Sequence, residues 1–124
     1  MRFSLFFGLM LTIGCSSSST PEITVRGKVE YFGQPLSGGM IVFTPDADRG
    51  ESGPLGFASI AGDGTYVLKS VEKGGVKAGW HRVTIAPPPD TGNRFPAKYR
   101  HPQSSGLLRE VKTDGENVID FRIE

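Results

Sequence analysis

The sequence is poor in the residues that form covalent cross-links and most metal sites. It holds one cysteine, Cys15, and two histidines, His81 and His101, among 124 residues. A single cysteine cannot form an internal disulfide, and histidines 20 positions apart do not fit a zinc-binding pattern. We therefore expect a fold that is held by its hydrophobic core, with no metal ion or other cofactor.

The sequence also lacks an excess of charge of one sign. It contains 14 Lys and Arg against 13 Asp and Glu, which gives a net charge of +1. Removal of an amino-terminal leader that includes Arg2 would leave a neutral chain. Because nucleic-acid binding depends on a basic surface, we expect no nucleic-acid partner.

No apolar run is long enough for a membrane-spanning helix. The apolar stretch near the amino terminus covers residues 3–13, and eleven helical residues span about 16 Å of a hydrocarbon core of about 30 Å. This length is typical of the apolar centre of a secretion signal. Gly14 and Cys15 follow it, and then four serines.

This junction resembles the signal of bacterial lipoproteins, in which a small residue and a cysteine follow the apolar segment. The resemblance implies a signal peptide over residues 1–14 and lipid attachment at Cys15, so that membrane lipid is the first partner. Residues 15–22 are then the anchor and a flexible, serine-rich tether. The expected location is the cell envelope, on the outer membrane, its periplasmic face or the cell surface. A plain secretion signal that is cleaved nearby is the alternative.

Residues 23–124 read as a single domain of short strands. Apolar residues alternate with polar ones over residues 23–31, 40–44, 65–69, 81–85 and 117–123. A weak strand is expected over 55–60 and a further strand over 107–112. Gly and Pro, 17 and 9 in number, punctuate these segments, and no stretch of ten residues after Ile13 has a helical period. The pattern predicts an all-β, two-sheet sandwich of seven strands.

Several motifs in this domain resemble carboxypeptidase regulatory-like domains. They are Val25-x-Gly27-x-Val29 with Gly33-Gln34-Pro35-Leu36-Ser37-Gly38, Asp63-Gly64-Thr65-Tyr66-Val67-Leu68, and Gly79-Trp80-His81-Arg82-Val83-Thr84-Ile85. The resemblance implies a seven-stranded Greek-key sandwich of the transthyretin (prealbumin) type, which is Ig-like in architecture. It also implies a non-catalytic accessory or binding module. Asp63, Gly64 and Tyr66 are expected to serve the fold, as a turn and a buried ring with a bonded hydroxyl.

A candidate contact surface follows from the long segment between residues 87 and 106. Trp80 is expected to point outward, and the segment adds cationic and aromatic side chains, so the candidate residues are Trp80, Arg94, Phe95, Lys98 and Tyr99. The partner would be an envelope protein or a glycan. Trp80 and Tyr99 lying together on an exposed face would favour a carbohydrate-binding module.

A calcium-binding loop and a hydrolase active site are the two other kinds of site that the sequence could contain. Asp46, Asp48 and Glu51 lack the spacing of a calcium-binding loop, so a solvated acidic turn is expected. A hydrolase of the transthyretin-like type would need a pocket in which His81 meets an arginine and backbone donors. The sequence lacks the carboxyl-terminal motif of that enzyme, no catalytic residue is predicted, and His81 and His101 are expected in the core and in solvent, respectively.

Overall fold

The computed structural model describes residue 8 and residues 23–70, 75–113 and 115–124. The predicted signal peptide over 1–14, the anchor Cys15 and the tether to residue 22 therefore lie outside the described part of the domain. Among the described residues, no helix has the length and apolar character needed to cross a membrane.

The first sheet is built around the long strand β1. One side of β1 pairs antiparallel with β5 and β2, and the other side pairs parallel with β9 and β10. Arg26, for example, lies opposite Val67 on one side and Val118 on the other. The strands are β1 (Thr24–Tyr31), β2 (Gln34–Pro35), β5 (Thr65–Val67), β9 (Glu116–Val118) and β10 (Phe121–Ile123).

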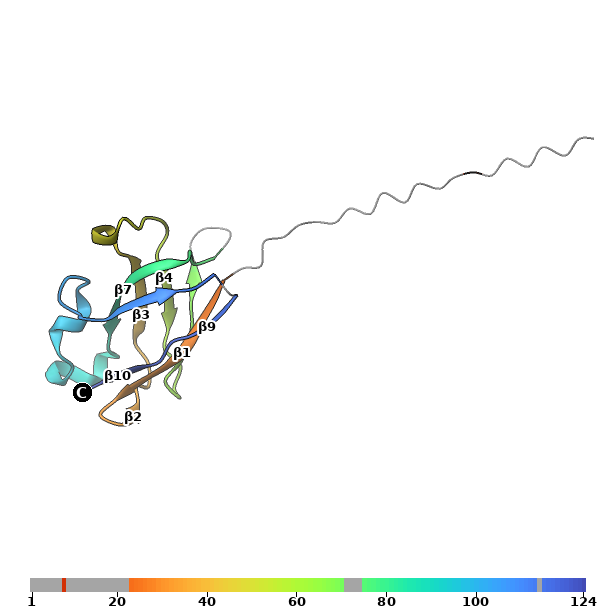
Figure 1. Cartoon of the computed structure of the whole chain (residues 1–124). Helices are drawn as coiled ribbons and strands as arrows, with labels where there is room; N and C mark the ends of the chain where they lie inside the picture. Colours follow the sequence, from red (N-terminus) through yellow and green to blue (C-terminus); the bar gives the residue numbers. More distant parts are fainter. Residues whose placement is uncertain (1–7, 9–22, 71–74, 114) are drawn as a thin grey trace, which may run out of the picture.

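The second sheet is antiparallel and has the order β6-β4-β3-β7-β8. Figure 1 shows β3, β4 and β7 in this layer, behind β1, β9 and β10 of the first. Its strands are β3 (Met40–Pro45), β4 (Gly56–Ser59), β6 (Lys69–Ser70), β7 (Gly79–Ala86) and β8 (Leu108–Val111).

The core lies between these two sheets, which makes the domain a β-sandwich. Val25 and Val29 point inward from β1, and Ile41 and Phe43 point inward from β3, as the alternation predicts. The Phe43 ring lies 6.0 Å from the Phe121 ring of the opposite sheet, centroid to centroid. The all-β prediction is confirmed for the described residues.

The motif residues around the β5 turn serve the fold as expected. Asp63 accepts hydrogen bonds from the Thr65 amide at 3.1 Å and hydroxyl at 2.6 Å, and these bonds lower the pKa of Asp63. Gly64 has a φ of +84°, which a residue with a side chain rarely adopts. Tyr66 is buried and donates its hydroxyl hydrogen to the Ile119 carbonyl.

Two predicted strands are divided in the structure. Residues 65–70 form β5 in the first sheet and β6 in the second, because the chain passes from one sheet to the other at Leu68. Residues 117–123 form β9 and β10, with Ile119 and Asp120 between them. With these two divisions and the short β2, which was not predicted, the described residues contain ten strand segments in two sheets, where the alternation predicts seven strands.

Three short 3-10 helices complete the described chain: η1 (Ala47–Arg49), η2 (Pro89–Arg94) and η3 (Ala97–Arg100). The segment 90–106 contains no strand, as predicted, and η3 packs against β7. The helix η1 directly follows β3, and residues 101–107 connect η3 to β8. Both segments therefore adjoin strands of the second sheet.

Candidate functional site

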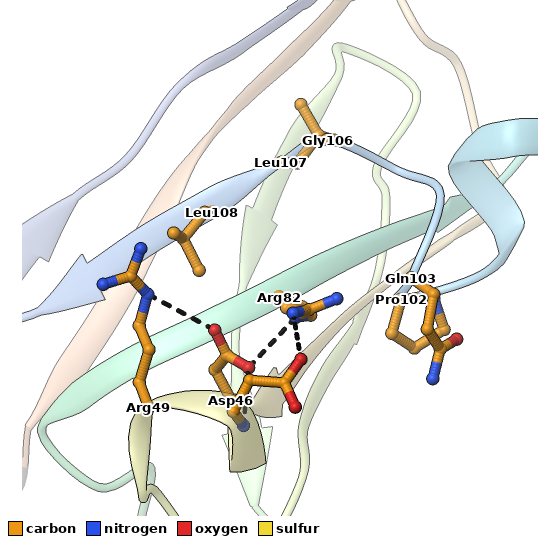
Figure 2. A pocket seen from close by; sticks show the side chains of 9 residues that line it. Asp46, Arg49, Arg82, Pro102, Gln103, Gly106, Leu107 and Leu108 are labelled. Carbon is orange, nitrogen blue, oxygen red and sulfur yellow. Dashed lines mark hydrogen bonds and ion pairs between the residues drawn. The ribbon is translucent and has the colours of Figure 1, made fainter.

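The candidate site is a pocket of about 370 Å³ on the outer face of the second sheet. Arg82 forms part of its floor, and it points outward because its neighbours His81 and Val83 are buried in the core. Figure 2 shows the pocket, and the residues that line it are Asp46, Asp48, Arg49, Arg82, Pro102, Gln103, Gly106, Leu107 and Leu108. They come from three parts of the chain: η1 with its amino-terminal cap, β7, and the segment 102–108.

A buried carboxylate stands at the centre of the charged residues. Asp46 is 3% exposed, and its Oδ1 accepts a hydrogen bond from Arg82 Nε at 3.0 Å. Arg49 Nε lies 3.4 Å from Asp46 Oδ2, and Arg82 Nη2 donates to Asp48 Oδ2 at 2.6 Å. A buried carboxylate is tolerated when it is paired and hydrogen-bonded, so these contacts fix both guanidinium groups in place.

The sequence of the β3–β4 connection explains how Asp46 reaches this position. Asp46 caps η1 by accepting a hydrogen bond from the Asp48 amide at 3.2 Å, and Gly50, with a φ of 77°, ends the helix. The Asp46 amide donates to the Trp80 carbonyl at 2.9 Å, which ties the loop to β7. Asp46 therefore holds the loop against β7 twice, through its backbone amide to Trp80 and through its carboxylate to Arg82.

The expectation of a solvated acidic turn is wrong for Asp46. Asp48 is exposed, but Asp46 is buried because a hydrogen bond from Arg82 and an ion pair with Arg49 replace its contacts with water. Glu51 is half-buried, and its Oε1 lies 3.4 Å from the Trp80 amide. Among residues 23–70, 75–113 and 115–124, no group of three His, Cys, Asp or Glu side chains is arranged to hold a metal ion.

Trp80 lies beside this pocket, and Arg49 covers one face of its ring. It alternates with the buried His81, which places it on the outer face, where it is half-buried. The Arg49 guanidinium carbon sits 5.0 Å from the centre of the Trp80 ring, in a cation–π contact. The contact occupies a face of the ring that a sugar would otherwise stack upon.

The aromatic residues of the predicted contact surface belong to the core instead. Phe95 and Tyr99 are both buried, with ring centroids 5.6 Å apart, and Phe95 also lies 5.4 Å from the Tyr31 ring. Arg94 and Lys98 are exposed, and Lys98 Nζ lies 4.9 Å from the centre of the Tyr99 ring. The prediction of exposed rings is therefore corrected, because the 3-10 helices turn these side chains inward. No described contact joins Trp80 to Tyr99.

The two histidines lie as predicted, one in the core and one in solvent. His81 is buried against Phe43, with ring centroids 6.1 Å apart, and its Nδ1 lies 3.0 Å from the Gly79 carbonyl oxygen. Its Nε2 has no hydrogen-bond partner among the described residues. Burial lowers the pKa of His81, so the ring is neutral near pH 7. His101 is exposed.

Sequence reasoning missed Arg82 and Gln103 as site residues. Arg82 occupies an outward position in a strand, where arginine is common, and its partner Asp46 lies 36 positions earlier. A local pattern could not pair them. Comparison of the chain with protein-family models, with curated proteins and with solved structures finds no match.

Proposed function

We propose that the protein is a lipid-anchored, non-catalytic binding module of the cell envelope, and that the pocket around Arg82 is its binding site. One observation carries the proposal. Three segments far apart in the sequence converge on one pocket, and a buried carboxylate holds two guanidinium groups there before any ligand arrives. Such preorganisation lowers the entropic cost of binding.

The location rests on the leader. The signal peptide over 1–14 would direct secretion, Cys15 would carry lipid, and residues 15–22 would join the anchor to the domain of residues 23–124. Two or three acyl chains give firm anchoring, since each buried methylene contributes about 0.8 kcal/mol. The partner is a component of the envelope, a protein or a glycan.

The family assignment is part of this proposal. Three described features support a carboxypeptidase regulatory-like domain with a transthyretin-like Greek key. They are the two-sheet core, the Asp63–Gly64 turn, and the buried Tyr66 that leads from it. Joining β5 with β6 across Leu68 and β9 with β10 across residues 119–120 leaves eight segments, and the seven family strands would correspond to these without the two-residue β2.

A non-catalytic role is favoured over a transthyretin-like hydrolase. The enzyme would need His81 in a pocket next to an arginine, whereas His81 points into the core and Arg82 points to the opposite face of the sheet. A general base must come within hydrogen-bond reach of the proton it removes, and His81 is 1% exposed.

The anchor is tested by Cys15→Ser in cells. We expect the variant to lose metabolic labelling with palmitate and to leave the membrane fraction, because the sulfur that accepts the lipid is gone. Ser16→Ala is the matched control and should label like the parent. Unchanged labelling of Cys15→Ser would refute the lipid anchor.

The binding role is tested by hydrogen exchange on the full chain in detergent, with and without an extract of envelope components. We expect slower exchange in residues 46–51 and 102–108 when the extract is present. The double variant Asp48→Asn, Gln103→Ala should lose this protection. Protection elsewhere in the domain, or none, would contradict the assignment of the pocket.

A further inference from the structure

We propose that the pocket binds an uncharged saccharide through its hydroxyl groups. The inference deepens the proposed function and rests on it, because it assigns a ligand class to the same pocket. The site differs from the one expected from the sequence, which depended on exposed Trp80 and Tyr99 rings.

The charges in the pocket are balanced. Asp46 and Asp48 match Arg49 and Arg82 in number, and every one of the four charges has an opposite partner within 3.4 Å. An anionic or cationic ligand would compete with one of these pairs and leave a charge without its partner. A neutral ligand exchanges with water and leaves the pairs intact, so the pocket discriminates against ions.

Several hydrogen-bonding atoms in the pocket remain unused. Arg82 bonds through Nε and Nη2, so Nη1 keeps both its hydrogens available, and Asp48 keeps its Oδ1. Arg49 is paired through Nε, which leaves the Nη groups. Gln103 makes no hydrogen bond to a described residue, and its amide both donates and accepts.

These atoms combine strong donors with strong acceptors within one small space. A sugar hydroxyl donates one hydrogen and accepts at its oxygen, so neighbouring hydroxyls can meet a guanidinium and a carboxylate at the same time. Figure 2 shows the free end of Arg82 directed toward Pro102 and Gln103, on the side away from Arg49. Charge-assisted bonds of this kind are about twice as strong as those between neutral groups.

Part of the pocket lining is apolar. Leu107, Leu108 and Pro102 line the pocket beside the polar groups, and Leu108 lies opposite Arg82 in the register of β7 and β8. A pyranose ring carries C–H groups on its faces and hydroxyls around its edge, and it fits a lining of this mixed kind. The volume of about 370 Å³ lies near the lower end of the range of small-molecule sites, about 300–1,000 Å³. This size suits one or two sugar rings.

The experiment uses the full chain in detergent micelles. Maltotriose, cellotriose and chitotriose serve as neutral probes in saturation-transfer NMR and titration calorimetry. A sulfated heparin disaccharide, inorganic phosphate and glycine serve as charged or zwitterionic probes. We expect at least one neutral trisaccharide to bind, and the charged probes to bind at least tenfold more weakly.

Two variants locate the site. Asp48→Asn should raise the dissociation constant by about tenfold or more, because it removes the charge from one hydrogen-bond partner, and Gln103→Ala should raise it by about two- to tenfold, as loss of a neutral hydrogen bond does. Gln34→Ala, at an exposed glutamine in β2 of the other sheet, is the matched control and should bind like the parent. Gln103 makes no bond within the described fold, so its variant tests binding even if Asp48→Asn loosens η1.

Three results would overturn the inference. These are failure of all three neutral probes to bind, preference for a charged probe, and binding that survives both variants. If neutral saccharides fail while an envelope extract still protects residues 46–51 and 102–108 from exchange, the binding module stands and its ligand class is wrong. If both experiments fail, the proposed function fails with the inference.

Discussion

Gly27 is the point where the carboxyl-terminal chain passes closest to β1. A Cβ built at Gly27 would lie 1.9 Å from the Ile119 carbonyl oxygen and 2.6 Å from its carbonyl carbon. The same oxygen accepts the hydroxyl hydrogen of Tyr66, and the Ile119 amide donates to the Arg26 carbonyl at 2.8 Å. Any side chain at Gly27 therefore has to displace a backbone segment that is held at two atoms.

The expected cost of Gly27→Ala follows from these contacts. The chain at Ile119 must move by about 1 Å to relieve the contact, and overpacking of this kind costs about 1–3 kcal/mol. The movement also takes the carbonyl away from Tyr66, and an unpaired buried hydroxyl costs about 1–3 kcal/mol more. We expect the free energy of unfolding to fall by about 2–6 kcal/mol, out of a total of about 5–15 kcal/mol for a domain of ordinary stability.

Urea denaturation of the full chain, followed by fluorescence of Trp80, measures this effect. Gly62→Ala is the matched control, since nothing lies within 4 Å of a Cβ at Gly62, and it should unfold like the parent. Tyr66→Phe separates the two causes, because it removes the hydrogen bond and leaves the space at Gly27 unchanged. A Gly27→Ala protein within about 0.5 kcal/mol of the parent would refute the close approach.

The core histidine and the buried carboxylate give two further predictions. Burial lowers the pKa of His81 in the folded state, so the unfolded chain binds a proton that the folded chain does not, and stability should fall as the pH drops below about 6.5. Urea midpoints at pH 7.5 and 5.5 measure this fall, and an equal fall in His81→Phe would contradict it. Asp46→Asn should lower the free energy of unfolding by about 1–3 kcal/mol, because it weakens the bonds to Arg82 and Arg49, while Asp90→Asn at an exposed turn should change nothing. Equal denaturation midpoints for the two asparagine variants would count against the network.

The alternation of apolar residues was sufficient to predict the long strands. Val25 and Val29, or Val83 and Ile85, are spaced by even numbers of residues, and the period of a strand places each pair on one face. The divisions at Leu68 and at residues 119–120 left no local signal. The first division arises because β5 pairs with β1 and β6 with β4 of the other sheet. β9 and β10 both pair with β1, but between them the Lys28 amide donates to the Asp120 side chain. Such partners cannot be deduced from local residue types.

The aromatic residues of the segment 87–106 show a second limit of sequence reasoning. Phe95 and Tyr99 stand among charged residues in a segment with no strand, which favours an exposed surface. Their burial depends on η2 and η3 folding back, where Tyr31 offers its ring to Phe95 and donates its hydroxyl hydrogen to the Arg94 carbonyl at 2.6 Å. Aromatic residues can be buried or exposed, and here their contacts with Tyr31 and with each other decide that they are buried.

The charged network of the pocket is more informative about function than about stability. Pairing a buried carboxylate such as Asp46 with arginine offsets the cost of removing it from water, and hydrophobic residues of similar size often stabilise a fold at least as well. A sandwich selected for stability alone would gain little from Asp46 and Arg82 at this position. A binding site gains rigid donors at fixed places, since Arg82 is held by two carboxylates and still keeps Nη1 free. This contrast is why the pocket, rather than the exposed Arg94 and Lys98, carries the proposed function.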